Sequence, residues 1–75
     1  MMNRKHWLYQ IANENNTSLY QIAKVSEIPE STLYKIVERN TPFKNITIST
    51  MNKIAQGLNL SAYDFINKYF NKYYK

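Results

Sequence analysis

Residues 18–40, SLYQIAKVSEIPESTLYKIVERN, have the pattern of two short helices joined by a tight turn. Ala23 stands four residues before a turn position, Glu27, and apolar side chains follow the turn. Those apolar residues are Ile28, Leu33 and Ile36. Two helices that cross near a right angle need a small side chain at their closest approach and apolar side chains to close the wedge between them. The stretch therefore predicts a crossed pair of helices over about residues 18–39.

The rest of the chain predicts three more helices, because apolar residues recur there at helical spacing. These segments are residues 7–12, 51–58 and 62–73. Hydroxyl residues that suit a helix N-cap precede three of the five helices, at Ser18, Thr47 and Ser61. No long run of alternating β-branched residues competes. We therefore expect an all-α protein, a compact five-helix bundle in one domain, residues 1–75, whose last helix, about 61–74, is extended at the C-terminus.

The joints between the helices are informative because the chain contains one glycine. Asn16, Asn40 and Asn59 each follow a predicted helix, where a left-handed residue is wanted and asparagine is the best choice after glycine. The joint inside the crossed pair offers only Glu27. A left-handed glutamate costs about 1 kcal/mol, so Glu27 is predicted to be a strained turn residue. A longer loop is expected at residues 40–46.

The composition argues against an enzyme and against a metal site. The 75 residues include no cysteine, one histidine and one aspartate, which leaves no convincing nucleophile, base or ligand cluster. We expect no metal, no other cofactor and no small-molecule ligand. No apolar run has the length of a signal-peptide core or a membrane span, so we expect no membrane contact and a cytoplasmic location. His6 is expected in an exposed first turn without a role, and Trp7 in the core.

The positive charge lies in the second half of the chain. The net charge is +5: residues 1–38 carry four basic and four acidic residues, whereas residues 39–75 carry six basic residues and one acid. A basic half on a small domain makes nucleic acid the leading partner class, ahead of an acidic protein or an anionic lipid surface.

With these features the chain resembles the Xre-type family of phage Cro and repressor DNA-binding domains. The resemblance covers about residues 3–66. It rests on the crossed pair and on STMNKIAQGLNLSAYDFI at residues 49–66, which is similar to the fourth and fifth helices of the family. It implies that the crossed pair is a helix-turn-helix whose second member, the third helix of the chain, enters the major groove of double-stranded DNA, usually in a symmetric dimer. Two positions depart from the family pattern: Glu27 stands where a turn glycine is usual, and Leu19 where a phosphate-binding glutamine is frequent.

The resemblance also implies which residues contact DNA. By this resemblance the base-reading positions fall on Glu30, Ser31 and Lys35, with Tyr34 close by. Helical spacing places Ser31, Lys35 and Glu38 opposite Leu33 and Val37, with Tyr34 on the flank and Glu30 in the first turn. In the family, the loop after this helix and the fourth helix flank the groove and contact the DNA backbone. The candidates for backbone contacts are Ser18, Thr32, Arg39, Lys44, Asn45 and Lys53.

Three glutamates on or near a DNA-facing helix need an explanation. Glu27 is expected to be a solvated turn residue. Glu30, in the first turn, is stabilised by the helix dipole with or without DNA, or it accepts a hydrogen bond from cytosine N4. Glu38 either pairs with Lys35, which is worth about 0.2–0.5 kcal/mol, or penalises non-specific phosphate contact. Lys35 itself either contacts guanine or is a solvated charge.

An aromatic stripe on the last helix has no obvious place in the minimal fold. Tyr69, Phe70 and Tyr73 lie beyond the range that the resemblance covers. Such stripes are usually part of a core, and a membrane-surface helix is disfavoured because only two or three turns are available. We interpret the stripe as a contact in a homodimer.

The sequence thus predicts a sequence-specific regulator of transcription that binds double-stranded DNA and reads the major groove with its third helix. The expected type is a small bacterial repressor encoded by a phage, a plasmid or a chromosome. The alternative is a helix-turn-helix module for protein interaction, such as an antirepressor or a toxin-neutralising partner, with little DNA binding. The neutral first half, Leu19 and the acids of the third helix support that alternative.

Overall fold

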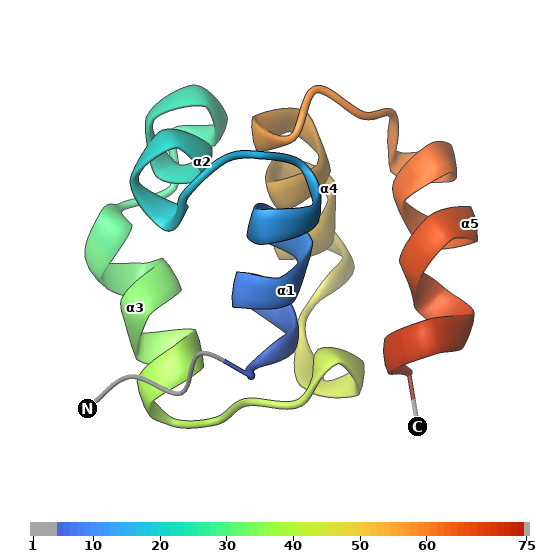
Figure 1. Cartoon of the computed structure of the whole chain (residues 1–75), viewed down its shortest axis with the longest axis horizontal. Helices are drawn as coiled ribbons and strands as arrows, with labels where there is room; N and C mark the ends of the chain where they lie inside the picture. The colour runs from blue at the N-terminus through green and yellow to red at the C-terminus, as the bar shows by residue number, and fades with distance from the viewer. Residues whose placement is uncertain (1–4, 75) are drawn as a thin grey trace.

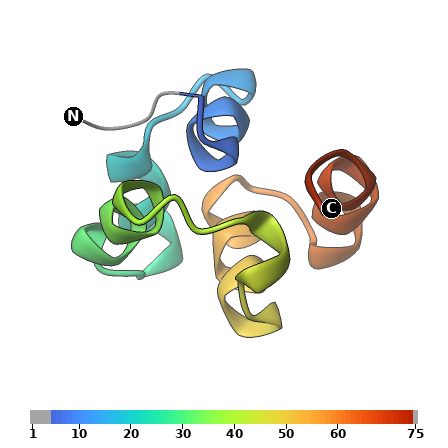
Figure 2. The same cartoon turned by 90° about the horizontal axis from the view of Figure 1, so that it is seen from below.

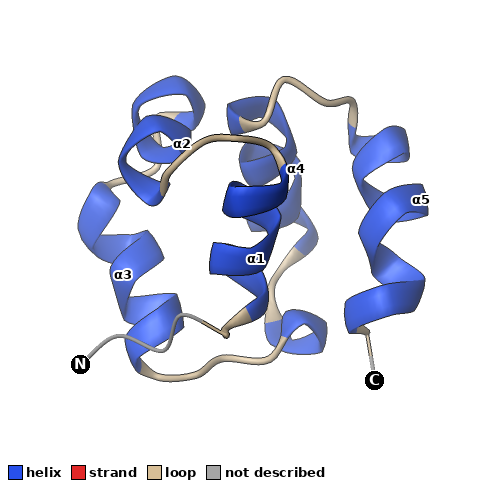
Figure 3. Cartoon of the chain, viewed as in Figure 1, coloured by secondary structure: helices blue, strands red, loops and turns tan. Residues whose placement is uncertain are grey.

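The computed structural model describes residues 5–74, and all regular structure in that range is helical (Figures 1 and 3). Five α-helices and one short 3₁₀ helix, η1, follow one another along the described chain. Their bounds are α1 Trp7–Glu14, α2 Leu19–Ser26, α3 Glu30–Glu38, η1 Phe43–Asn45, α4 Ile48–Gly57 and α5 Ala62–Tyr73. The prediction of an all-α, five-helix fold is confirmed.

The helices surround one apolar core. α1 and α4 lie between the α2–α3 pair on one side and α5 on the other (Figures 1 and 2). α2 contacts α1, α3 and α4, and α5 packs against α4. The position of α3 therefore depends on α2, which connects it to the rest of the core.

α4 comes very close to α2 at Gly57. A Cβ atom placed on Gly57 would lie 2.7 Å from the carbonyl oxygen of Ile22 and 2.9 Å from its Cγ2 atom. Carbon atoms do not approach a packed backbone so closely, so any side chain at this position would push the two helices apart. The one glycine of the sequence serves a close helix contact rather than a turn.

The three predicted N-caps are confirmed. The side-chain oxygens of Ser18, Thr47 and Ser61 each accept a hydrogen bond from the backbone N–H three residues further on, at 3.0 to 3.2 Å. Each bond satisfies one N–H group that the first turn of a helix leaves without an internal partner. The starts of α2, α4 and α5 are therefore set by local sequence.

The three asparagine joints are also confirmed. Asn16, Asn40 and Asn59 have φ angles of 54°, 53° and 63°. At each joint the asparagine N–H donates to the carbonyl three residues back, and the next N–H donates to the carbonyl five residues back. This pair of bonds satisfies the last carbonyl groups of a helix and ends it with a left-handed residue.

Glu27 is left-handed as well, with φ 64° and ψ 18°, so the predicted turn geometry between α2 and α3 is confirmed. Its side chain is exposed, whereas the preceding Ser26 is buried. The Ser26 hydroxyl oxygen accepts a hydrogen bond from the Ile28 N–H at 3.3 Å, on the far side of the turn. The surrounding contacts keep a conformation that is unfavourable for a residue with a Cβ atom.

Replacing Glu27 with glycine should raise the free energy of unfolding by about 0.5–1 kcal/mol. Relief of the left-handed conformation is worth about 1–2 kcal/mol. The greater freedom of glycine in the unfolded chain removes about 0.4–1 kcal/mol of that gain. Urea unfolding measures the difference. Glu27→Ala is the matched control because it deletes the carboxylate but keeps the Cβ, so it should stay near wild type; an equal rise in both variants would assign the effect to the carboxylate instead.

Trp7 lies in the core as predicted, but the prediction for His6 is wrong. His6 is 4% exposed and forms the N-cap of α1, where its Nδ1 atom accepts a hydrogen bond from the Leu8 N–H at 3.1 Å. Its Nε2 atom lies 2.9 Å from the carbonyl oxygen of Thr41, which also accepts a hydrogen bond from Trp7 Nε1 at 2.9 Å. Two aromatic side chains thus connect the start of α1 to the loop that follows α3.

Acidification below about pH 6.5 should destabilise the protein through His6. The ring accepts at Nδ1 and donates at Nε2, so it is held neutral, and burial lowers its pKa below 6.5, although the hydrogen bond to Thr41 opposes the shift. The folded state then binds fewer protons than the unfolded state. The contribution of neutral His6 to the free energy of unfolding is therefore complete above pH 6.5. It is lost as the pH falls through the lowered pKa of the folded state.

Urea unfolding between about pH 7.5 and about pH 5 checks this, since ordinary carboxyl groups titrate lower, near pH 4. His6→Asn is the control, because asparagine keeps an N-cap acceptor without a titrating group, and its stability should vary little in this window. A wild-type profile as flat as that of the variant would contradict the prediction.

Tyr69 belongs to the core, which corrects its assignment as a dimer contact. Its side chain is 1% exposed, and its ring lies 5.3 Å from that of Phe65 and 6.1 Å from that of Tyr73. Its hydroxyl oxygen accepts a hydrogen bond from Asn15 Nδ2 at 2.8 Å. A side chain enclosed in this way has no surface left to offer to a second copy.

The buried ring of Phe43 organises the remaining aromatic residues. Four ring centroids lie 5.1 to 6.4 Å from its own, those of Trp7, Phe65, Phe70 and Tyr73. The expected long loop after α3 thus contains η1, which Phe43 anchors to the core. Phe70 and Tyr73 are half-buried by these contacts, so the aromatic stripe of α5 is largely a part of the domain itself.

Candidate nucleic-acid interface

α3 presents a polar face to solvent because two of its apolar residues are buried. Leu33 is 0% and Val37 1% exposed. On the opposite side Ser31, Lys35 and Glu38 are exposed, as helical spacing predicts. The outward face expected for base reading is therefore exposed to solvent.

One flank of this face is basic. Thr32, Lys35 and Arg39 line a shallow groove of about 180 Å³ together with Ile36 and Thr41. We call it the basic groove. The basic groove brings together Lys35, a candidate for base reading, with Thr32 and Arg39, which are candidates for contacts with the DNA backbone. Thr41 is an addition that the sequence did not suggest, because its position depends on the hydrogen bonds from the start of α1.

The other flank of α3 is acidic and holds Glu30 and Tyr34, one helical turn apart. Both side chains are half-buried. Burial raises the pKa of Tyr34 above its usual 10.0, and its interaction with the nearby Glu30 carboxylate raises it further. The phenol therefore keeps its proton at neutral pH and remains a donor.

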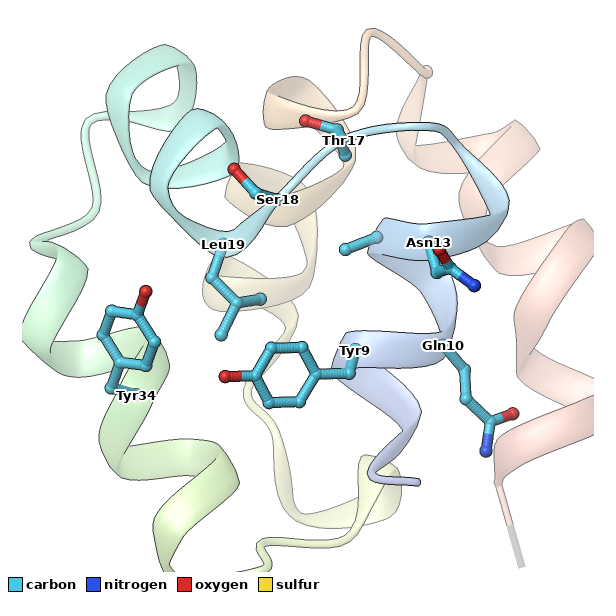
Figure 4. A pocket seen from close by; sticks show the side chains of 8 residues that line it. Tyr9, Gln10, Asn13, Thr17, Ser18, Leu19 and Tyr34 are labelled. Atoms are coloured by element: carbon cyan, nitrogen blue, oxygen red, sulfur yellow. The ribbon is translucent and has the colours of Figure 1, made fainter. Parts of the chain in front are cut away.

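A larger groove of about 480 Å³ lies beside this acidic flank (Figure 4). We call it the tyrosine groove. Its lining comes from α1, the start of α2 and α3, and consists of Tyr9, Gln10, Ala12, Asn13, Thr17, Ser18, Leu19 and Tyr34. None of these side chains carries a formal charge. Figure 4 shows Tyr9 extending from α1 toward Tyr34 on α3, so two phenol groups face the same opening.

The remaining candidates for backbone contacts are exposed but do not converge on one point. Ser18 lies at the start of α2 and lines the tyrosine groove; its oxygen already caps the helix, which leaves its O–H free to donate. Lys44 and Asn45 lie on η1, at the end of the loop that leaves α3 (Figure 1), and Lys53 lies on α4. These side chains are spread over the start of α2, η1 and α4.

Leu19 is 1% exposed and belongs to the core, so the position where the resembling family often has a glutamine offers no hydrogen-bond donor from its side chain. Tyr9 also lines the tyrosine groove, and the sequence does not predict this position. It lies in a helix outside the crossed pair, and only the packing of α1 beside α2 places its ring at the tyrosine groove.

Much of the basic charge lies away from α3. Lys68 and Lys72 are on α5, across the molecule from α3 (Figures 1 and 2). Lys68 Nζ is 3.8 Å from Glu14 Oε1, and the two ammonium groups lie 5.5 and 5.3 Å from the ring centres of neighbouring tyrosines. Lys75 lies outside the described residues. The positive charge of α3 and its C-cap comes from Lys35 and Arg39 rather than from the whole basic half.

Two classes of feature are absent from residues 5–74. No group of three or more His, Cys, Asp or Glu side chains there could hold a metal ion. The longest described helix, α5, has 12 residues, and no helix combines the length and the apolar character that crossing a membrane requires.

The sequence from residue 8 to residue 69 matches the family described as Cro/C1-type HTH DNA-binding domain, where HTH stands for helix-turn-helix. The matched range begins in α1, contains α2, α3 and α4, and ends in α5 at the buried Tyr69. Searches of curated proteins and of solved structures found no match.

Proposed function

The chain belongs to the family of Cro/C1-type helix-turn-helix DNA-binding domains, and we propose that it is a sequence-specific regulator of transcription that reads the major groove with α3. The proposed mode of action is repression, by a small bacterial protein encoded by a phage, a plasmid or a chromosome. We propose that the protein acts by binding DNA and does not catalyse a reaction.

One observation carries the proposal: Thr32, Lys35 and Arg39 converge on the basic groove along the exposed face of α3. A helix in the major groove has base edges in front of it and a phosphate strand at each side. Lys35, near the middle of α3, suits the first kind of contact, and Arg39, at its C-terminal end, suits the second. Lys44 and Lys53, on the next two elements, are proposed to extend the contacts along the same DNA backbone.

A salt titration with random duplex DNA tests whether the protein binds DNA at all. We expect weak affinity at low salt, with log K falling linearly against log salt by about 0.9 for each phosphate that is neutralised. A selection of bound duplexes from a randomised library then tests sequence specificity. A recovered palindrome would support a symmetric dimer at the same time.

Absence of binding to duplex DNA would favour the second candidate function, a module for protein interaction. The burial of Leu19 and the acidic flank of α3 are the observations that favour it. In that case the salt titration should show no binding to random duplex even at low salt, because the phosphate contacts that give non-specific affinity would be missing.

The proposal includes a homodimer formed through the outer surface of α5. Tyr63 is 75% and Tyr74 48% exposed, and Phe70, between them on the same face, stacks on Tyr74 with ring centroids 4.5 Å apart. Residues seven and eleven positions apart fall on one side of a helix. Exposed aromatic side chains in a row are typical of surfaces that bind another protein.

Analytical sedimentation at tens of micromolar tests the dimer. Tyr63→Ser and Tyr74→Ser together should give a monomer with the wild-type helix content by circular dichroism, because Tyr63 is 75% and Tyr74 48% exposed. A wild-type chain that is already monomeric at these concentrations would remove the dimer from the proposal.

A further inference from the structure

We propose that His6 is a positioning residue for DNA binding: it holds the carbonyl group of Thr41 and so sets the segment that joins Arg39 to Lys44. The inference rests on the proposed function and adds to it a buried residue that acts on the interface through the backbone. Its consequence is that DNA binding weakens as the solution becomes acidic.

The backbone of Thr41 is held from two helices. The segment between α3 and η1 passes the start of α1 (Figure 1), where His6 Nε2 and Trp7 Nε1 each lie 2.9 Å from the Thr41 carbonyl oxygen. On the other side, the Thr41 N–H donates a hydrogen bond to the carbonyl oxygen of Ile36 in α3 at 3.0 Å. Both polar groups of this peptide unit are therefore tied to the fold.

Thr41 stands between two of the residues that are proposed to contact the DNA backbone. Arg39 is the C-cap of α3, and Lys44 lies on η1. Thr41 itself lines the basic groove with Lys35 and Arg39. Contacts with phosphate fix the register of a protein on the duplex, so they depend on how the groups that make them are spaced. A displacement of the Thr41 backbone would change the spacing of Arg39 and Lys44.

The hydrogen bonds of His6 fit only the neutral ring. Nδ1 accepts from the Leu8 N–H at 3.1 Å, while Nε2 donates to the Thr41 carbonyl oxygen. A protonated ring carries a hydrogen on both nitrogens, so its Nδ1–H would meet the N–H of Leu8. The ring, which is buried, then has to move. The Thr41 carbonyl either moves with it or loses one of its two donors.

The protonation of His6 is governed by this local environment. Burial lowers the pKa of His6, and the hydrogen bond to Thr41 acts in the opposite direction. The neighbouring elements carry charged side chains, but none is among the causes of the shift. These side chains are Lys5 just before His6, Glu14 on α1, Lys35, Glu38 and Arg39 on α3 and its C-cap, and Lys44 on η1.

The chain contains one histidine, which makes a pH profile specific for His6. Ordinary carboxyl groups titrate near about pH 4, and the N-terminal amino group titrates near about pH 8. A change in DNA affinity between about pH 7 and about pH 5 that a His6 variant lacks is therefore assigned to this ring.

The experiment uses the full chain as wild type, His6→Asn and Trp7→Phe. Binding to random duplex, and to the duplex selected from a randomised library, is measured between about pH 7.5 and about pH 5. His6→Asn keeps an N-cap acceptor for α1 but has no donor in place of Nε2. Trp7→Phe keeps an aromatic ring and deletes the other donor to Thr41. Circular dichroism at each pH gives the folded fraction, by which every affinity is corrected.

We expect the wild-type affinity for both duplexes to fall by roughly two- to tenfold on acidification, the lower range of coupling between residues of one hydrogen-bond network. His6→Asn should bind more weakly than wild type at about pH 7.5, by a similar factor, and should vary little with pH. Trp7→Phe should also bind more weakly but should keep the acid-dependent fall, because its histidine still titrates. Both duplexes respond alike, since contacts with phosphate carry no sequence information.

Three results would overturn the inference while the protein still binds duplex, so that the proposed function stands. The first is a wild-type affinity that stays constant or rises on acidification, as an added positive charge alone would cause. The second is a fall that disappears after correction for the folded fraction, because His6 would then affect stability alone. The third is wild-type affinity of both variants at neutral pH. If the wild type binds no duplex at any pH, the proposed function fails and the inference fails with it.

Discussion

Tyr69→Ala should lower the free energy of unfolding by about 3–5 kcal/mol. The side chain is 1% exposed and contacts the rings of Phe65 and Tyr73. Truncating a buried aromatic residue to alanine costs about 3–5 kcal/mol, because apolar contacts are lost and a cavity remains. A domain of 75 residues has a total stability of only about 4–11 kcal/mol at the usual value per residue. One substitution therefore removes a large part of what keeps this chain folded.

Tyr69→Phe is the matched variant, because it keeps the ring and deletes the hydroxyl that accepts from Asn15. The Asn15 amide also donates to the Ile11 carbonyl oxygen, at 2.8 Å, so it keeps one partner and the cost should be about 1 kcal/mol. Circular dichroism and urea unfolding measure both variants. A loss below about 1 kcal/mol in Tyr69→Ala would mean that α5 does not close the core, and the stripe on α5 would again be free for a second copy.

The parts of the fold that the sequence predicts are those decided by neighbouring residues. The helix ends depend on hydrogen bonds between residues that are close in sequence. This holds for the N-caps at Ser18, Thr47 and Ser61 and for the left-handed asparagines. Helical periodicity likewise separates the buried from the exposed side of α3, because the helix imposes that spacing on every side chain.

The features that the sequence did not predict depend on distant partners. His6 is buried because Thr41 supplies a carbonyl group 35 positions away. Tyr69 is buried because Asn15, 54 positions away, lies at the end of α1 where α5 passes. Phe43 lies in a segment that the sequence predicts to be a loop, although four aromatic rings from α1 and α5 surround it. No local pattern carries that information.

In the candidate site, too, some features follow from local sequence and others depend on residues far apart in the chain. Lys35 and Ser31 face outward as the helical spacing predicts, and Glu30 and Tyr34 are four positions apart, a spacing that permits a contact on any helix. The tyrosine groove could not be predicted, since it requires Tyr9 of α1 to lie beside α3.

Lys35→Ala and Lys44→Ala should separate base reading from backbone contact. Lys35 lies on the exposed face of α3 in the basic groove, so we expect it to reach base edges. Lys44 lies on η1, outside α3, so we expect it to reach only phosphate. Lys35→Ala should cost about 1–3 kcal/mol on the preferred site, equivalent to a loss of roughly 5- to 150-fold in affinity, and leave random duplex almost unaffected. Lys44→Ala should weaken both DNAs equally and lower the salt slope by about one.

Titrations of both variants on the preferred site and on random duplex, across a salt series, distinguish these outcomes. The two substitutions are matched, since each deletes one exposed lysine and leaves the core intact. Arg39 sharpens the comparison, because it shares the basic groove with Lys35 but lies at the C-terminal end of α3. If Arg39→Ala behaves like Lys44→Ala, contact with bases ends between residues 35 and 39. If instead Lys35→Ala weakens both DNAs alike, the basic groove binds phosphate along its whole length, and sequence reading by α3 would depend on Glu30 and Ser31 alone.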